Sequence, residues 1–500
     1  GGANAASGDK PAKAEDKPKA IKIDLEDMER RAVQIPVAPG NFSQLMVAHD
    51  GKLIYVRQST RRGSSEAAIK VFDINDDAKE EKQVIAGGGR LQLSADGKKL
   101  LVVRGGSLQV LDPVAGGGKP TTVPTAGMKV TIDPRQEWRQ IFHDVWRIQR
   151  DYFYEPTMHG VDWPKMREHY GRMVEDATSR EDLAWILGEM ISELNIGHAY
   201  VTSPGDVEQQ PNVAVGMLGC DFELFVDGDV AAYRISKIYE GAPWDVDARG
   251  PLSQPGVNVK EGDFLLAVNG VPVDTSKDPW AAFIDTANRP TTITVGKNPV
   301  IDEHARDVLV KPMGGEQALR TRAWIERNRR YVEERTDGKV GYIYVPNTGV
   351  DGQNELFRQF MGQRGKAALI IDERWNGGGQ IPTRFIELLN RPVTNYWAVR
   401  DGLDWVWPPD AHQGPKCMLI NGLAGSGGDA FPYYFKQAGI GKTIGMRTWG
   451  GLVGISGNPG LIDGGYVTVP TFGFYKLDGN WGVEGHGVDP DIEVVDDPAK

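Results

Sequence analysis

The chain has 500 residues, of which 40% are hydrophobic and 25% charged, and its formal net charge at pH 7 is −11. This length predicts several domains, and the acidic balance argues against nucleic acid or an anionic membrane as the main partner. No apolar run approaches the roughly 20 residues that a membrane-spanning helix requires, so we expect no membrane partner. Two cysteines, Cys220 and Cys417, are too few for a disulfide framework or a cysteine zinc site.

The first 40 residues predict a linker or tail, because residues 1–20 contain no aromatic side chain and cannot bury enough apolar surface to fold. Strand-rich sequence follows over residues 41–126 and contains an internal repeat. The segment His49–Arg57 recurs as Ala95–Arg104. A repeat of about 45 residues with short strands is typical of β-propeller blades. Since two blades cannot close a ring, we expect the end of a larger propeller, with a small β-sandwich as the alternative.

Residues 127–212 predict a helical domain. Apolar residues recur every three or four positions from Pro134 to Tyr152, which is typical of an amphipathic helix. A second helix is predicted to begin at Ser179, where a capping-box variant marks the start, and to end near Asn195.

Residues 213–312 change to strand-rich sequence and predict a separate β-domain. The stretch Gly262–Gly270 reads Gly-Asp-Phe-Leu-Leu-Ala-Val-Asn-Gly, which resembles the signature of PDZ domains of the bacterial protease-associated kind. This resemblance implies a module that binds extended peptide termini by adding a strand to a sheet edge. The alternative is a spacer that binds nothing.

Residues 313–500 predict an α/β domain in which strands alternate with helices. Two of its predicted strands end in glycine-rich turns: Ala367–Asp372 precedes Gly377–Gly379, and Cys417–Asn421 precedes Gly425–Gly428. Ligands of such sheets collect beyond the carboxyl ends of the strands. We therefore expect both turns to donate backbone N–H groups into one crevice.

Ser426 is the candidate nucleophile. It stands between glycines at a strand-to-helix turn, which lifts a hydroxyl out of the sheet edge and aims N–H groups at the group it attacks. The alternative is a helix N-cap at Ser426 or Asp429. Among the eight histidines, His198 and His486 are equal candidates for the base. Glu484 could orient an imidazole, although a solvated loop carboxylate is the commoner case.

We expect no metal ion and no cofactor. The sequence has no H-E-x-x-H motif and no clustered set of cysteine and histidine residues. No Lys-Ser or Lys-Thr pair follows either glycine turn, as a phosphate-binding loop would require. Lys436 and Lys442 follow Ser426 at spacings that give a Ser-Lys dyad only weak support.

The last domain resembles the tricorn proteases, within the larger S41 family of serine peptidases. The matching stretches are Asp372–Gly379, Ala424–Asp429, Gly441–Ile455 and Gly482–Asp491, and the order of the predicted domains also agrees. The resemblance implies a multidomain α+β chain: a partial β-propeller, a helical domain, a PDZ-like domain and an α/β catalytic domain of the crotonase/ClpP-like kind. Tricorn proteases have a longer N-terminal half, so the chain looks like the C-terminal portion of such a protein.

The resemblance assigns roles to five residues. The nucleophile falls on Ser426, the orienting acid on Glu484, and the base on His198 rather than on His486. The oxyanion donors fall on the backbone N–H groups of Gly379 and Gly427. The resemblance also implies hydrolysis of short or unfolded peptides through an acyl-enzyme, and a homo-oligomer, often a hexamer. Because tricorn proteases are cytoplasmic, the resemblance implies a cytoplasmic protein; since some bacterial relatives look exported, a periplasmic or exported protein is the alternative.

The chain departs from the family pattern at two positions. Tricorn proteases often have a serine before the histidine, where this chain has Gly197, so the tetrad becomes a triad or another group or water replaces that hydroxyl. The archetypal pattern has aspartate after the nucleophile, which favours basic side chains at the cleaved bond. Gly427 in that position argues against trypsin-like specificity. Gly197 also supports an alternative function, a catalytically inert peptide-binding scaffold that uses the PDZ-like domain. A third possibility, an acyl-CoA enzyme, lacks a recognisable nucleotide-binding motif.

Overall fold

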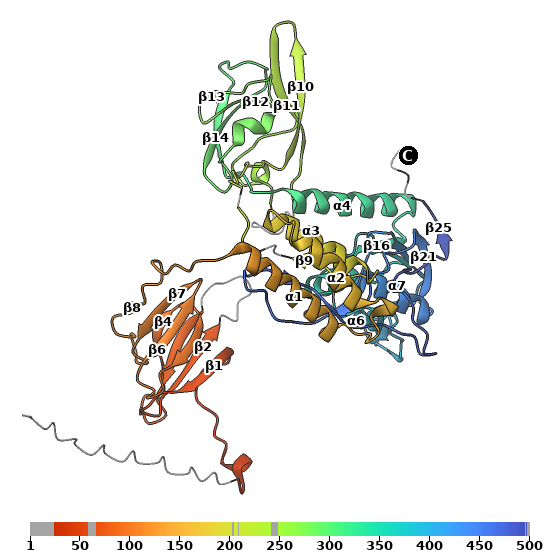
Figure 1. Cartoon of the computed structure of the whole chain (residues 1–500). Helices are drawn as coiled ribbons and strands as arrows, with labels where there is room; N and C mark the ends of the chain where they lie inside the picture. Colours follow the sequence, from red (N-terminus) through yellow and green to blue (C-terminus); the bar gives the residue numbers. More distant parts are fainter. Residues whose placement is uncertain are drawn as a thin grey trace, which may run out of the picture. The chain divides into compact units, whose positions relative to one another are not determined.

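The computed structural model describes residues 25–58, 67–202, 205–208, 210–241, 249–495 and 497. The chain divides into two compact units, one up to Thr131 and one from Ile132 (Figure 1). Most of the predicted linker, residues 1–24, lies outside the described residues. The remainder of that linker contains one short 3-10 helix, η1 (Met28–Arg31).

The first unit contains two four-stranded antiparallel sheets. Their strand orders are β1-β2-β3-β4 and β5-β6-β7-β8. The strands are β1 (Asn41–Val47), β2 (Leu53–Gln58), β3 (Ala68–Phe72), β4 (Glu81–Ala86), β5 (Arg90–Leu93), β6 (Leu100–Arg104), β7 (Ser107–Leu111) and β8 (Thr121–Thr122).

The sequence repeat of this unit lies on the inner strands β2 and β6. These strands supply core residues that include Ile54 and Leu100, both with no exposed surface. The repeat therefore corresponds to two sheets of the same strand order. No closed ring of sheets forms among the described residues of this unit.

The second unit begins with three packed helices, α1 (Pro134–Tyr152), α2 (Trp163–Val174) and α3 (Arg180–Ser192). Asp133 caps α1, and the Ser179 side chain begins α3 in a capping box, so the two predicted helices are confirmed. Helix α2 was not predicted, and only three of its twelve residues are buried.

The next part of the unit is a six-stranded antiparallel sheet. Its strands are β10 (Cys220–Asp227), β11 (Val230–Ile238), β12 (Phe264–Val268), β13 (Val271–Pro272), β14 (Thr291–Gly296) and β15 (Arg306–Val310), with η4 (Pro251–Ser253) and η5 (Pro279–Phe283) between them. Strand β12 is buried throughout. Gly262 and Gly270 flank it with φ values of 91° and 77°, a conformation that glycine adopts without steric cost. This requirement explains the glycines of the recognised signature.

Helix α4 (Gln317–Arg335) leads to the last part of the chain, which is built on a five-stranded parallel sheet. The sheet order is β16-β17-β20-β21-β25, and the strands are β16 (Val340–Tyr344), β17 (Ala368–Asp372), β20 (Lys416–Ile420), β21 (Gly441–Gly445) and β25 (Ile492–Glu493). The helices α5 (Val350–Gln363), α6 (Pro382–Leu389) and α7 (Gly427–Gln437) supply much of its core, including Phe360, Phe385 and Phe431. The predicted alternation of strands and helices is confirmed.

Three short strand pairs complete this part of the chain. Strands β18 (Asn395–Trp397) and β19 (Trp405–Trp407) form a hairpin, and β22 (Gly454–Ile455) pairs with β24 (Pro470–Phe472). Strand β23 (Tyr466–Val467) pairs with β9 (Val201–Thr202), which directly follows the helical region. In the described part of the chain, no helix is both long and apolar enough to cross a membrane.

Candidate active site

The two glycine-rich turns leave the same edge of the parallel sheet. Strands β17 and β20 are hydrogen-bonded neighbours, and Asp372 at the end of β17 lies opposite Leu419 in β20. Because parallel strands point the same way, the turns at 377–379 and 425–428 both start beyond this edge. The expectation that they share one crevice is confirmed, since Gly379 and Gly427 line the same cavity.

Two buried asparagines hold these turns in place. The Asn376 side chain accepts the Gly378 N–H at 2.9 Å and donates to the Val345 carbonyl at 3.2 Å. The Asn421 side chain accepts the N–H groups of Trp375 and Leu423. Neither asparagine was identified from the sequence, although each stands just after a strand and before a glycine turn, which was the available signal.

Ser426 has an unusual backbone conformation, with φ 59° and ψ −115°. A positive φ is rare for a residue with a side chain and costs free energy that the surrounding structure must offset. Helix α7 begins at the next residue, so Ser426 occupies the N-cap position of α7, as the alternative interpretation proposed. A strained serine at a strand-to-helix turn is also the geometry of an exposed nucleophile.

Asp429 stabilises this conformation from the first turn of α7. Its carboxylate accepts the Ser426 N–H at 2.7 Å, the Thr448 hydroxyl at 2.5 Å, and the N–H groups of Gly450 and Gly451 at 2.7 and 3.1 Å. The side chain is fully buried. Burial raises its pKa, and these four hydrogen bonds oppose the shift because they favour the charged form. Asp429 thus joins α7 to the 448–451 loop.

His198 reaches the cavity because the β9–β23 pair joins the helical region to the last part of the chain. The Thr468 hydroxyl donates to the His198 carbonyl at 2.7 Å and accepts the Tyr200 N–H at 2.8 Å. The imidazole lies 5.6 Å from the Trp449 ring, centroid to centroid. Its Nδ1 atom is buried without a hydrogen-bond partner among the described residues.

Burial and charge act in opposite directions on this imidazole. Burial lowers the pKa of His198, because a charged ring loses hydration, while the carboxylates of Glu484 and Asp429 partly offset the shift. The result is a histidine whose neutral form is favoured, which is the form that a general base requires.

Glu484 accepts hydrogen bonds from the backbone around the histidine. One carboxylate oxygen accepts the Gly197 N–H at 2.9 Å, and the other accepts the N–H groups of Leu452 and Val453 at 2.5 and 2.8 Å. All three recorded hydrogen bonds therefore go to main-chain amides. The sequence predicted that this acid orients the imidazole, and its hydrogen bond to the amide of Gly197, the residue before His198, was not foreseen.

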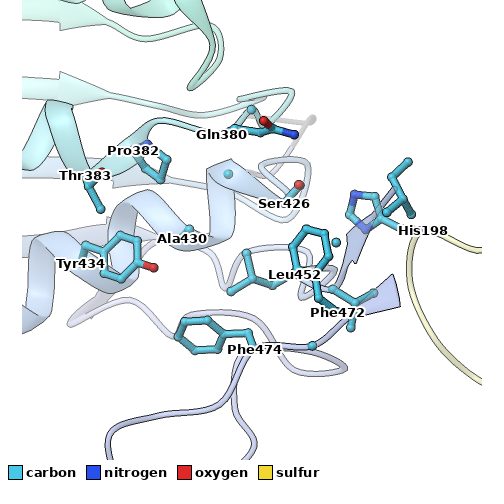
Figure 2. Close-up of a pocket in the computed structure, with 16 residues that line it drawn as sticks. His198, Gln380, Pro382, Thr383, Ser426, Ala430, Tyr434, Leu452, Phe472 and Phe474 are labelled. Carbon is cyan, nitrogen blue, oxygen red and sulfur yellow. The ribbon is translucent and has the colours of Figure 1, made fainter. Parts of the chain in front are cut away.

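The cavity has a volume of about 580 Å³. Figure 2 shows Ser426 and His198 at the cavity on separate elements, with Ser426 at the start of α7 and Ala430 and Tyr434 further along that helix. Its lining residues come from five segments: His198; Gly379, Gln380, Pro382 and Thr383; Ser426, Gly427, Ala430 and Tyr434; Leu452, Val453, Gly454 and Ile455; and Phe472, Gly473 and Phe474.

His486 lies apart from this cavity. Its Nε2 atom is 2.8 Å from Asp489, its Nδ1 atom faces Arg447, and it lines a different cavity together with Trp481. Lys436 forms an ion pair with Asp491. Neither side chain is among the residues that surround Ser426.

A second buried acid lies behind the site. Glu373, directly after β17, has no exposed surface, and neither of its oxygens has a hydrogen-bond partner in the part of the chain described. Burial, reinforced by the charges of Asp429 and Asp372, raises the pKa of Glu373 well above its usual value. Burial therefore favours the neutral form of Glu373 beside the Asp429 carboxyl.

Comparison with protein families finds three matches along the second unit. Residues 134–192 match the tricorn protease C1 domain, residues 216–315 the tricorn protease PDZ domain, and residues 339–494 peptidase family S41. The chain belongs to the tricorn protease family.

Individual tricorn relatives cover nearly the whole chain. Tricorn protease homolog 1 of Streptomyces coelicolor is 34% identical over 95% of this chain and 45% of its own length. The tricorn protease of Thermoplasma acidophilum is 31% identical over 95% and 44%. A crystal structure of the tricorn protease superposes with a TM-score of 0.84 at 29% identity, over 95% of this chain and 46% of that one. The chain thus spans about half the length of the curated relatives it matches.

The two departures from the tricorn pattern have steric consequences. A Cβ atom at Gly427 would lie 1.9 Å from the Thr348 hydroxyl and 2.7 Å from the Gly379 nitrogen, so no side chain fits there. A Cβ atom at Gly197 would lie 3.0 Å from the Glu484 carboxylate and 3.1 Å from the Gly451 Cα atom, which is tight. Thr348 was not identified from the sequence, since it lies about 80 residues from Ser426 in the chain and only the fold brings them together.

Proposed function

We propose that this chain is a tricorn-like serine peptidase that hydrolyses peptide bonds in short or unfolded peptides. The supporting observation is the convergence of Ser426, His198 and the two glycines Gly379 and Gly427 on one cavity. Neither glycine N–H has a recorded acceptor among the described residues, so both remain available to a ligand. The match to a peptidase family and to tricorn relatives favours this function over an inert scaffold.

The proposed reaction begins with Ser426. Its Oγ attacks the carbonyl carbon of the substrate while His198 takes the hydroxyl proton, through Nε2 because Nδ1 is buried. The N–H groups of Gly379 and Gly427 stabilise the resulting oxyanion, each by about 3–4 kcal/mol if they resemble donors in other serine proteases. His198 then protonates the leaving amine as the C–N bond breaks. Water hydrolyses the acyl-enzyme by the same steps in reverse order.

Glu484 takes the role of the orienting acid in this proposal. Through its hydrogen bonds to Gly197, Leu452 and Val453 it fixes the main chain before His198 and one wall of the cavity. Its charge also stabilises the imidazolium that forms during each proton transfer.

We also propose a domain division that follows the sequence boundaries: 1–40, 41–126, 127–212, 213–312 and 313–500. The two four-stranded sheets over 41–126 are proposed to be blades of a β-propeller, which their matching strand orders support. The parallel sheet with α5, α6 and α7 is proposed to be a crotonase/ClpP-like catalytic domain.

We further propose that the protein forms a homo-oligomer, a hexamer by resemblance to the family pattern. The β18–β19 hairpin supports this, because Tyr396, Trp397, Trp405 and Trp407 are each 46–62% exposed in the single chain. A cluster of four exposed aromatic residues marks a contact surface.

The test of the peptidase proposal compares the wild-type chain with Ser426→Ala and His198→Ala. Wild type is expected to cleave an unfolded peptide library and to react with a fluorophosphonate at Ser426, located by mass spectrometry. Both variants should lose at least about 1,000-fold in kcat/KM, in the range known for triad residues. Ser236→Ala, at an exposed serine that does not line the cavity, is the matched control. Undiminished hydrolysis by Ser426→Ala would refute the proposal.

A further inference from the structure

We infer that the cavity beside Ser426 selects a large apolar side chain on the acyl-side residue, meaning the residue that contributes the carbonyl of the cleaved bond. This inference rests on the proposed peptidase function and specifies its substrate class. Three features support it. The cavity lining carries no formal charge, the two nearest carboxylates already accept several hydrogen bonds, and the cavity extends away from His198.

The lining is mainly apolar and contains no formal charge other than the one His198 can acquire. None of the lining residues that the structure describes is aspartate, glutamate, lysine or arginine. Ala430, Pro382, Leu452 and the rings of Phe472 and Phe474 supply apolar surface. A lysine, arginine or glutamate side chain entering this space would lose hydration without gaining a partner charge, which is costly.

The two acids nearest the site are already engaged. Asp429 accepts four hydrogen bonds, and Glu484 accepts three. Neither lines the cavity. Their charges are therefore used to hold the Ser426 turn and the main chain around His198. They do not provide the counter-ion that a basic side chain needs.

The cavity extends away from the histidine. His198 must protonate the leaving amine, so the leaving group departs on the His198 side and the acyl part lies on the opposite side of Ser426. In Figure 2, Ala430, Tyr434, Pro382 and Phe474 lie on that opposite side. Along α7, Ala430 and Tyr434 follow Ser426 by four and eight residues, which corresponds to about 6 and 12 Å of helix rise. This depth accommodates a large side chain.

The aromatic walls are held by packing. Phe474 stacks edge-on against Tyr433, with ring centroids 5.2 Å apart. Phe472 covers Gly454 so closely that a Cβ atom there would lie 1.9 Å from the ring. Gly454 is therefore the residue that lets Phe472 form one side of the cavity, and these rings offer an apolar surface in a defined position.

The experiment measures kcat/KM on internally quenched peptides that are identical except at one position, occupied by Leu, Phe, Ala, Lys or Glu. Mass spectrometry identifies the cleaved bond. The kcat/KM for peptides with Leu or Phe at this position should exceed that for Lys or Glu by about 100-fold, and that for Ala by about 10-fold. These ratios are in the range by which apolar pockets discriminate between side chains. The Ser426→Ala chain establishes which cleavage depends on this site.

Two variants place an acid in the cavity. Ala430→Asp and Thr383→Asp should each raise the ratio of kcat/KM for Lys over Leu by at least about 10-fold, because the new carboxylate pairs with the substrate amine. Thr383 is exposed, so its substitution tests the idea even if the buried Ala430 does not tolerate an acid. Gln437→Asp adds the same charge at the exposed end of α7, outside the cavity lining, and should leave the ratio unchanged.

The outcomes separate this inference from the proposed function. Cleavage that depends on Ser426 but is as efficient after Lys as after Leu overturns the apolar selectivity and leaves the peptidase intact. Unchanged ratios in both folded acid variants also overturn it. A chain that neither cleaves any of the peptides nor reacts with a fluorophosphonate at Ser426 overturns both.

Discussion

At the scale of single residues, the pKa of the proposed base His198 is set by two opposing influences, burial and the charge of Glu484. Burial favours the neutral imidazole, and the Glu484 carboxylate favours the charged one. Because Glu484 is bonded to the Gly197 amide, it also fixes the chain that carries the ring. One carboxylate therefore influences both the pKa and the position of His198.

The first prediction concerns Glu484→Gln. A general base works only when neutral, so kcat/KM should fall as the pH drops through the pKa of His198, with a midpoint below 6.5 in the wild type. Removing the Glu484 charge removes a contribution that raises this pKa, so the midpoint should move to still lower pH. The plateau should also fall, by roughly 10-fold, the effect of about 1.4 kcal/mol.

The measurement is kcat/KM against pH on one apolar peptide. Glu303→Gln, at an acid whose side chain is 87% exposed, is the matched control and should reproduce the wild-type curve. A midpoint that moves to higher pH in Glu484→Gln would contradict the electrostatic account.

At the scale of elements, the start of α7 must pack directly against the other glycine turn. A Cβ atom at Gly427 would fall 2.6 Å from the Gly379 carbonyl oxygen and 2.7 Å from its nitrogen. The two amides proposed for the oxyanion thus belong to backbone segments in close contact. This contact explains, in steric terms, why the position after Ser426 carries no side chain in this chain.

The second prediction is that Gly427→Ala lowers kcat/KM by about 100-fold or more, since a displacement of about 1 Å at a reacting centre has that effect. KM should change less than kcat, because the oxyanion forms only during reaction. Thermal unfolding and kinetics on the same samples provide the measurement.

Gly362→Ala is the matched control for this change. It lies in α5, where a Cβ atom meets nothing within 4 Å, and alanine should stabilise that helix by about 0.5–1 kcal/mol. Wild-type activity in Gly427→Ala would contradict the proposed oxyanion site.

At the scale of the whole molecule, the β18–β19 hairpin carries a cluster of aromatic side chains that the single chain leaves exposed. Trp397 and Trp405 are directly paired across its strands and are 56% and 62% exposed. Exposed apolar clusters of this kind favour association. The proposed oligomer would cover them.

The third prediction is that the wild-type chain has the mass of an oligomer in light scattering, and that Trp397→Ser with Trp405→Ser shifts it towards a single chain. Leu477→Ser is the matched control, because Leu477 is 97% exposed but lies outside the hairpin. The hairpin assignment fails if the double variant keeps the wild-type mass at equal concentration.

Several features were predictable because they are local properties of the sequence. The apolar periods predicted α1 and α3, and the Asp-Gly repeat predicted two similar groups of strands. Glycines at strand ends predicted the two turns of one crevice. Glycine has no side chain, so it adopts a positive φ and allows close backbone approach at low steric cost. Helix α2 was not predicted, and its buried residues Trp163, Tyr170 and Val174 pack into a core shared with α1 and α3.

The sequence by itself determined that a serine stands at a strand-to-helix turn, and its resemblance to the tricorn family pointed to His198. Only the tertiary structure decided what surrounds them. Pairing of β9 with β23 brings His198 to the cavity, and Glu484 binds the Gly197 amide there. The uncharged walls of the cavity come from segments far apart in the chain. Such contacts depend on long-range packing, which a local pattern of residues does not encode.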